Sequence, residues 1–372
     1  MNLTLRKFTG AILAISALLM QDTRADLAGP SAIANYTVPA GIGSPALRMD
    51  LFATPFVRPV EAKGSVTAVN TSAANAVFTV TLDAGETLPA LNNTTTSGST
   101  NDERYILEIL DGSAIGLILY PNANTGSSGS GVTITVSGGL GGLSVPNGSR
   151  FNIRKDWTLS SLFGAPSPNN PFGSGIDPNG SGVNAWVQVY VSATGSVRSY
   201  YINHNTTTGV YSWQQSTSQT VRDHLRIPTG QGVVIVNKKA SSFTFPVTGE
   251  VRIARTRLVV PKGLTTFVAN PSPVANNFYD STIVDTTPTV GTYPADATTS
   301  DTWRIWRPET RQFRDLLVAD DGVNGRTVHT TTAITKRDSA STFQLIAPFT
   351  CVGFKPVGPT TETTVVTIAP KL

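Results

Sequence analysis

Three aromatic side chains of this chain have the type and spacing that suit ligand recognition. Tyr200 and Tyr201 are adjacent, and Trp213 follows after a short polar segment. Neighbouring residues of a strand point to opposite faces of a sheet, so we expect one of the two tyrosines to be exposed. A flat aromatic ring with asparagine and arginine donors beside it can hold a sugar ring. Core or cross-strand packing is the favoured interpretation of these rings, and a glycan platform at Tyr200, Tyr201 and Trp213 is the alternative.

The residues that most often bind metal or attack a substrate do not form a recognisable pattern. The histidines have no partner at the spacing of a zinc site; they are His204, His224 and His329. Cys351 lies in an apolar segment, which is typical of a buried side chain. The Asp-Gly turns at 177–182 and 320–325 lack the late glutamate of a calcium loop, so plain turns are expected. No metal or cofactor is assigned.

Acidic pairs could serve glycoside hydrolysis, but their separation in space cannot be obtained from the sequence. The adjacent pairs are Asp102 with Glu103 and Asp320 with Asp321. Neighbours in a strand would point to opposite faces, which does not suit a shared substrate. No catalytic residue is assigned, and the alternative of a hydrolase or lyase acting on extracellular polysaccharide stays open.

The elements that position the aromatic residues occur twice in the chain. Residues 187–201 (VQVYVSATGSVRSYY) align without a gap with residues 303–317 (WRIWRPETRQFRDLL), so that Arg198 matches Arg314. Apolar residues alternate on both sides of a short polar break, which predicts a β-hairpin. The offset of 116 residues becomes 119 farther on, where Val233 matches Val352. This agreement predicts an internal duplication of about 110 residues.

The predicted organisation is all-β, with a small β-barrel or sandwich domain followed by two copies of a sandwich-like unit. Residues 26–62 are rich in proline, so we expect an extended lead-in with one edge strand. Residues 63–155 form the small domain, 156–262 the first copy and 263–372 the second. Strands of the small domain are expected at 65–69, 77–82, 105–110, 115–120, 132–136 and 150–153.

The first 25 residues have the pattern of a signal peptide. Arg6 and Lys7 precede a short apolar segment at 8–20, and a small-residue cleavage site ends at Ala25. The apolar segment is too short to span a bilayer as a helix. We therefore expect export to the periplasm, the cell surface or the medium, with no membrane span in the mature protein.

The charge and composition of the chain indicate which kinds of molecule it can be expected to bind. Charged residues make up 14% of the chain, so Ser, Thr, Asn and Gly must cover much of the surface, as on exposed strands. Cleavage after Ala25 reduces the 28 basic and 24 acidic residues to 25 and 23. A nearly neutral mature chain does not indicate a nucleic-acid partner.

Several motifs in a fixed order resemble a known group of proteins. They are WTLSSLFG at 157–164, VYVSATGSVRSYY at 189–201, IPTGQGVVIVNK at 227–238, VTGEVRIARTRLVVPKGL at 247–264 and FVANPSPV at 267–274. Together they resemble an uncharacterised family of exported all-β proteins from verrucomicrobia and their relatives, over residues 63–370. The second hairpin departs from the pattern at Arg311 and at Leu316-Leu317. The resemblance implies a Gram-negative exported β-protein and supplies no catalytic residue.

These observations favour an exported, non-catalytic β-protein that serves as a structural component of the surface, matrix or envelope. The second hypothesis is a carbohydrate-binding module, and the third is the polysaccharide hydrolase or lyase. The partners expected are an extracellular glycan or other envelope proteins.

Overall fold

The computed structural model describes most of the chain from residue 28 onward. The described residues are 28–42, 47–72, 75–91, 104–137, 139–191, 196–252, 255–270, 276–277, 287–292, 298–307, 312–320, 326–330, 333–337, 345–346 and 350–368. Their regular elements are almost all strands, which confirms the all-β prediction. The one α-helix among them is α1 (Leu159–Phe163). The predicted signal peptide lies outside the described residues.

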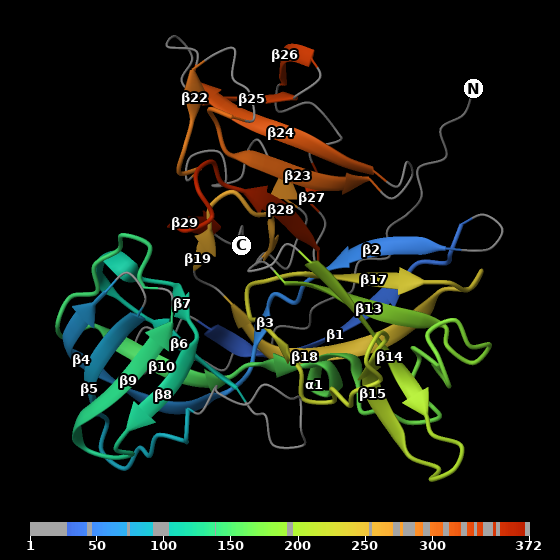
Figure 1. Cartoon of the computed structure of the whole chain (residues 1–372). Coiled ribbons are helices and arrows are strands. Elements are labelled where there is room, and N and C mark those ends of the chain that lie inside the picture. The colour runs from blue at the N-terminus through green and yellow to red at the C-terminus, as the bar shows by residue number, and fades with distance from the viewer. Residues whose placement is uncertain are drawn as a thin grey trace.

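A nine-stranded sheet builds the small domain and continues beyond it. Its order is β29-β19-β7-β6-β10-β4-β5-β9-β8 (Figure 1). Each of the six strands expected between residues 63 and 155 is present, and β8 is additional. The strands of the small domain are β4 (Val60–Thr71), β5 (Asn75–Leu82), β6 (Tyr105–Ile109), β7 (Leu117–Leu119), β8 (Pro121–Thr125), β9 (Ser130–Ser137) and β10 (Arg150–Lys155).

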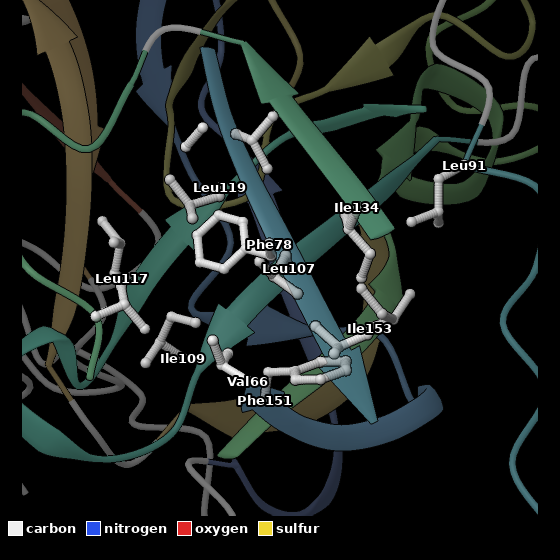
Figure 2. Packing of buried hydrophobic residues seen from close by; sticks show 14 of the residues in the cluster. Val66, Phe78, Leu91, Leu107, Ile109, Leu117, Leu119, Ile134, Phe151 and Ile153 are labelled. Atoms are coloured by element: carbon white, nitrogen blue, oxygen red, sulfur yellow. The ribbon is translucent and has the colours of Figure 1, made fainter. Parts of the chain in front are cut away.

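The inner face of these strands encloses an apolar core. Figure 2 shows Phe78 and Phe151 among aliphatic side chains from β4, β6, β7, β9 and β10. Gly64 lets β4 approach this core closely, since a Cβ there would lie 2.4 Å from the Thr81 carbonyl oxygen and 2.8 Å from the Phe151 ring. Any side chain at this position would separate β4 from β5, so the sequence needs glycine here.

The first sandwich packs a three-stranded sheet on a six-stranded one. The small sheet has the order β1 (Ala28–Val38), β18 (Phe243–Arg252), β3 (Phe56–Val57). The large sheet has the order β12 (Ser174–Gly175), β14 (Ser196–His204), β13 (Ala185–Val191), β17 (Val233–Asn237), β2 (Arg48–Phe52), with β15 (Tyr211–Gln215) on β14. The short strands β11 (Trp157–Thr158) and β16 (Arg226–Ile227) pair beside them.

The segment expected to be an extended lead-in contributes three paired strands to this sandwich. Strand β1 pairs with β18, β2 with β17, and β3 with β18. Phe52 and Phe56 lie in the same core as Phe163 and Phe245. The prolines fall largely between these strands, where no ladder hydrogen bond is lost, which is why a proline-rich segment can still form strands. The small domain is therefore inserted between β3 and the rest of the first sandwich.

The second sandwich has a seven-stranded sheet of its own. Its order is β20 (Thr266–Ala269), β28 (Cys351–Lys355), β23 (Thr302–Arg307), β24 (Gln312–Asp320), β25 (Arg326–Thr330), β26 (Ala333–Arg337), with β22 (Gly291–Thr292) on β24. Strands β19 (Thr256–Pro261) and β29 (Thr363–Ile368) pair with each other and share a core with this sheet. Strands β21 (Asn276–Asn277) and β27 (Leu345–Ile346) form a separate pair.

The two large sheets use the same pairings at positions that the sequence alignment matches. Val187 pairs with Tyr200 in the first hairpin, and Trp303 pairs with Leu316 in the second. The parallel pair Gly175–Asn203 likewise has its counterpart in Gly291–Ala319. Both sheets also end in an edge strand antiparallel to the next, β2 on β17 and β20 on β28. A duplication requires these pairings, and common ancestry of the halves stays a prediction.

Buried charges join the small domain to the first sandwich. Arg154 on β10 forms ion pairs with Glu108 on β6 and with Glu250 on β18. Glu108 also receives Arg252 of β18, and both Arg154 and Glu108 are almost fully buried. Charges removed from water are tolerated only when they are paired in this way, so the network fixes β18 against the small domain.

No helix of the described residues is long and apolar enough to cross a membrane.

Candidate functional site

The aromatic residues singled out from the sequence are all buried. The exposed fractions are 2% for Tyr200, 1% for Tyr201 and 0% for Trp213, so the prediction of one exposed tyrosine is wrong. Tyr200 and Trp213 face the three-stranded sheet, whereas Tyr201 lies on the opposite face. There its hydroxyl donates to the carbonyl of Ile176, 3.4 Å away, in the segment that follows β12. Burial raises the pKa of both tyrosines.

The side chains considered as metal ligands or nucleophiles also make contacts that are typical of a structural role. His204 stacks on Tyr211 at 4.3 Å between ring centres, and burial raises the pKa of the Cys351 thiol. Asp177 forms a plain turn, in which its carboxylate accepts from the Asn179 N–H at 2.7 Å. Among the described residues no group of three metal-ligating side chains comes together. Asp102, Glu103 and Asp321 and the side chain of His329 lie outside the described residues.

An apolar cleft of about 240 Å³ lies where the first sandwich meets the second, and we call it the interface cleft. Its lining residues lie on β2, β13, β14 and β17 of one sheet and on β20, β23 and β24 of the other, with Thr265 just before β20. The lining residues are Met49, Leu51, Gln188, Tyr190, Val197, Val234, Thr265, Phe267, Arg304, Trp306 and Phe313.

Four aromatic rings hold one another in place along this cleft. Tyr190 meets Phe267 edge to face, with the ring centres 5.6 Å apart. Phe313 stacks on Phe267 at 5.9 Å and meets Trp306 at 4.9 Å. The indole N–H of Trp306 donates to the Met49 carbonyl at 2.8 Å, which ties the second sandwich to the first. The rings are therefore preorganised, and Phe313 remains 38% exposed.

Two polar side chains, Gln188 and Arg304, line the cleft at equivalent positions of the two hairpins. Gln188 donates to the Ser199 hydroxyl at 3.3 Å, directly across the first hairpin. Arg304 pairs with Asp315 at 3.3 Å, directly across the second. Each pair leaves donors that a ligand in the cleft can use, because an amide and a guanidinium carry more N–H groups than one partner accepts.

The cleft is built from the same positions of the two halves. The matched pairs are Met49 with Thr265, Leu51 with Phe267, Gln188 with Arg304, Tyr190 with Trp306, and Val197 with Phe313. Beside the cleft, Gly232 meets its own counterpart, since a Cβ at Gly232 would lie 2.1 Å from the Cys351 sulfur. Contact between equivalent positions is the property of an approximate two-fold axis, here between the two sandwiches.

Sequence reasoning missed this cleft, although one signal for it was present. Tyr190 and Trp306 match in the hairpin alignment and lie on the face away from each sandwich core. Large aromatic residues repeated on an outward face indicate a covered surface or a binding surface.

No protein-family model, curated protein or solved structure matches the chain. The functional argument therefore rests on the geometry of the cleft. A largely apolar concavity with a few fixed polar groups is the usual form of a site for a small ligand.

Proposed function

We propose that this chain is an exported, non-catalytic β-protein of the cell surface, matrix or envelope that binds a glycan in the interface cleft. The observation that carries the proposal is the set of preorganised rings of Tyr190, Phe267, Trp306 and Phe313 beside Gln188 and Arg304. Export rests on the signal-peptide pattern of residues 1–25 and on the family resemblance.

The chemistry of the cleft suits a sugar ring. The C–H groups on one face of a pyranose can rest on aromatic rings, while amide and guanidinium donors bind its hydroxyls. A volume of about 240 Å³ lies below the range common for larger ligands, which favours a single ring of a chain.

A glycan array on the secreted protein, followed by titration of variants on any hit, tests this proposal. Phe313→Ala is the first variant, because its ring is partly exposed and its loss should disturb packing least. We expect it, and Tyr190→Ala, to weaken binding by about 2 kcal/mol, or about thirtyfold.

Tyr211→Ala is the matched control, since this ring stacks on His204 and does not line the cleft. Absence of any hit, or a hit that both cleft variants bind as tightly as the unaltered protein, would refute the glycan site.

A purely structural function of the same exported protein is the second candidate. The buried network of Glu108, Arg154, Glu250 and Arg252 favours it, because it joins the small domain firmly to the first sandwich. Strands β19 and β29 add the second sandwich to the sheet of the small domain. Cell fractionation tests this candidate: a structural component should stay with the washed envelope, and recovery only as free protein would count against it.

A further inference from the structure

The charge of the interface cleft restricts the ligand that it can accept. Arg304 is the one charged residue among the described residues that line it. Its contacts are with Asp315: Nε lies 3.3 Å from Oδ1, and Nη2 donates to Oδ2 at 3.3 Å. Asp315 is not a lining residue, but it lies directly across the second hairpin from Arg304. The cleft therefore presents a guanidinium whose charge a second residue already compensates.

The equivalent pair of the first hairpin is uncharged. The offset of 116 residues that relates the hairpins places Gln188 on Arg304 and Ser199 on Asp315. One wall thus holds a neutral amide and hydroxyl, and the other holds two charges that cancel. Neither pair leaves a net charge that would attract an ionic group.

The charged residues of β2 do not alter this balance. This strand lines the cleft with Met49 and Leu51, and Arg48 and Asp50 alternate with them, so they lie on its other face. There the guanidinium of Arg48 is 4.0 Å from the carboxylate of Asp50, which also accepts from the Tyr36 hydroxyl. These two charges therefore compensate each other away from the ligand.

An anionic group gains little from such a cleft. A carboxylate beside Arg304 would be attracted by the guanidinium and repelled by Asp315, and it would lose its hydration in a largely apolar space. A hydroxyl needs one donor and one acceptor. The amide of Gln188 offers both, and the guanidinium offers further donors, so uncharged hydroxyls suit these walls.

We propose that the ligand of the interface cleft is an uncharged sugar, and that Asp315 is the residue that excludes acidic sugars. This inference rests on the proposed function, because it concerns the charge of the glycan that the cleft binds. A repulsive group directed against the wrong ligand is a common source of specificity. Asp315 acts through its charge and through Arg304, without lining the cleft itself.

Matched neutral and acidic sugars test this inference on the full chain. The pairs are methyl glucoside with methyl glucuronide and methyl galactoside with methyl galacturonide, which differ only in a hydroxymethyl group that the acidic sugar replaces with a carboxylate. In titrations at neutral pH we expect the neutral member of a pair to bind about tenfold more tightly.

Equal or tighter binding of the acidic member would overturn the inference and leave the glycan site standing. If none of the four sugars binds, the inference also fails, whereas the glycan site itself fails only if the glycan array gives no hit. The two failures are therefore distinguishable.

Asp315→Asn tests the assigned residue, because it removes the carboxylate charge with little change of shape. We expect the ratio of acidic to neutral affinity to rise about tenfold. This gain should shrink as the salt concentration rises from about 0.1 to 1 M, since salt screens the uncovered charge of Arg304. A purely structural effect of the substitution would not depend on the charge of the sugar.

Glu362→Gln is the matched control. It also removes a carboxylate from an ion pair, here with Lys262 at 2.7 Å, and neither residue lines the cleft. An unchanged ratio in Asp315→Asn, or the same rise in Glu362→Gln, would overturn the role of Asp315.

Arg304→Gln gives an independent test in the opposite direction. It introduces the residue that the first hairpin has at the equivalent position, and it leaves the charge of Asp315 without its partner. We expect the ratio of acidic to neutral affinity to fall below that of the unaltered protein. A rise of this ratio in Arg304→Gln would contradict the exclusion of acidic sugars by Asp315.

Discussion

At the scale of single residues, the contact between Gly232 and Cys351 sets how closely the two sandwiches approach. The amide of Gly232 donates to the Phe267 carbonyl at 2.9 Å, so the backbones themselves touch here. A side chain at Gly232 would collide with both the Cβ and the sulfur of Cys351. The interface cleft depends on this approach, because Leu51 and Phe267 lie on the strands beside it.

Gly232→Ala should therefore destabilise the protein by about 1–3 kcal/mol, since the added methyl group must displace packed atoms. Urea unfolding monitored by tryptophan fluorescence measures the loss. The double variant with Cys351→Gly should lose less than the sum of the two single variants, because it removes the atoms that the methyl group meets. Strictly additive losses would show that the collision does not determine stability.

The carboxyl of Asp50 gives a second prediction at this scale. Burial raises its pKa, against the opposing effects of Arg48 and of the Tyr36 hydroxyl. A carboxyl with a raised pKa binds its proton more tightly in the folded state, so it favours folding below the ordinary pKa of about 3.8. Its contribution is lost as the pH rises through the folded-state value.

The substitution Asp50→Asn removes this titration. We expect the stability of Asp50→Asn relative to the unaltered protein to improve as the pH rises from about 3.5 toward neutrality, where the difference should level off. Denaturant unfolding of both proteins across this range measures it. If the relative stability of Asp50→Asn falls over the same range, the effect of Arg48 on the pKa of Asp50 is larger than the effect of burial.

At the scale of elements, the buried ion network fixes β18 against β6 and β10. Glu108 accepts both Arg154 and Arg252, so its loss would leave Arg252 without this carboxylate and Arg154 with the carboxylate of Glu250 alone. Breaking one member of a buried network costs far more than breaking an exposed ion pair.

We expect Glu108→Ala to destabilise the protein by about 3–5 kcal/mol in urea unfolding. Glu362→Ala is the control, since its 2.7 Å pair with Lys262 is largely exposed and should contribute at most about 1 kcal/mol. Similar losses in the two variants would show that the network is not what joins the domains.

At the scale of the whole molecule, the order of the domains follows from an insertion. Strands β1, β2 and β3 precede the small domain but complete the first sandwich, whose other strands follow it. The second sandwich has β19 and β20 in the corresponding places without an insertion. The chain must therefore retain residues from 28 onward to close the first core.

We predict cleavage after Ala25, which meets this requirement because it removes the apolar leader and leaves β1 intact. Intact mass measurement and N-terminal sequencing of exported protein should give Asp26 as the first residue. An exported protein that retains Met1, or one cut inside β1, would contradict it.

The sequence by itself determined the local elements of this protein. Alternation of apolar and polar residues around short polar breaks marks strands and turns, and it predicts the hairpins at 187–201 and 303–317. In the structure these hairpins pair Val187 with Tyr200 and Trp303 with Leu316. These features depend on residues close in the chain, so a single sequence contains them.

Only the tertiary structure decided which faces are covered. Alternation places Tyr200 and Tyr201 on opposite faces of β14, but it cannot show that both faces are covered there, so that both rings are buried. The cleft likewise joins residues as distant as Met49 and Phe313. Their proximity depends on the packing of whole sheets, in which the close approach at Gly232 sets the spacing.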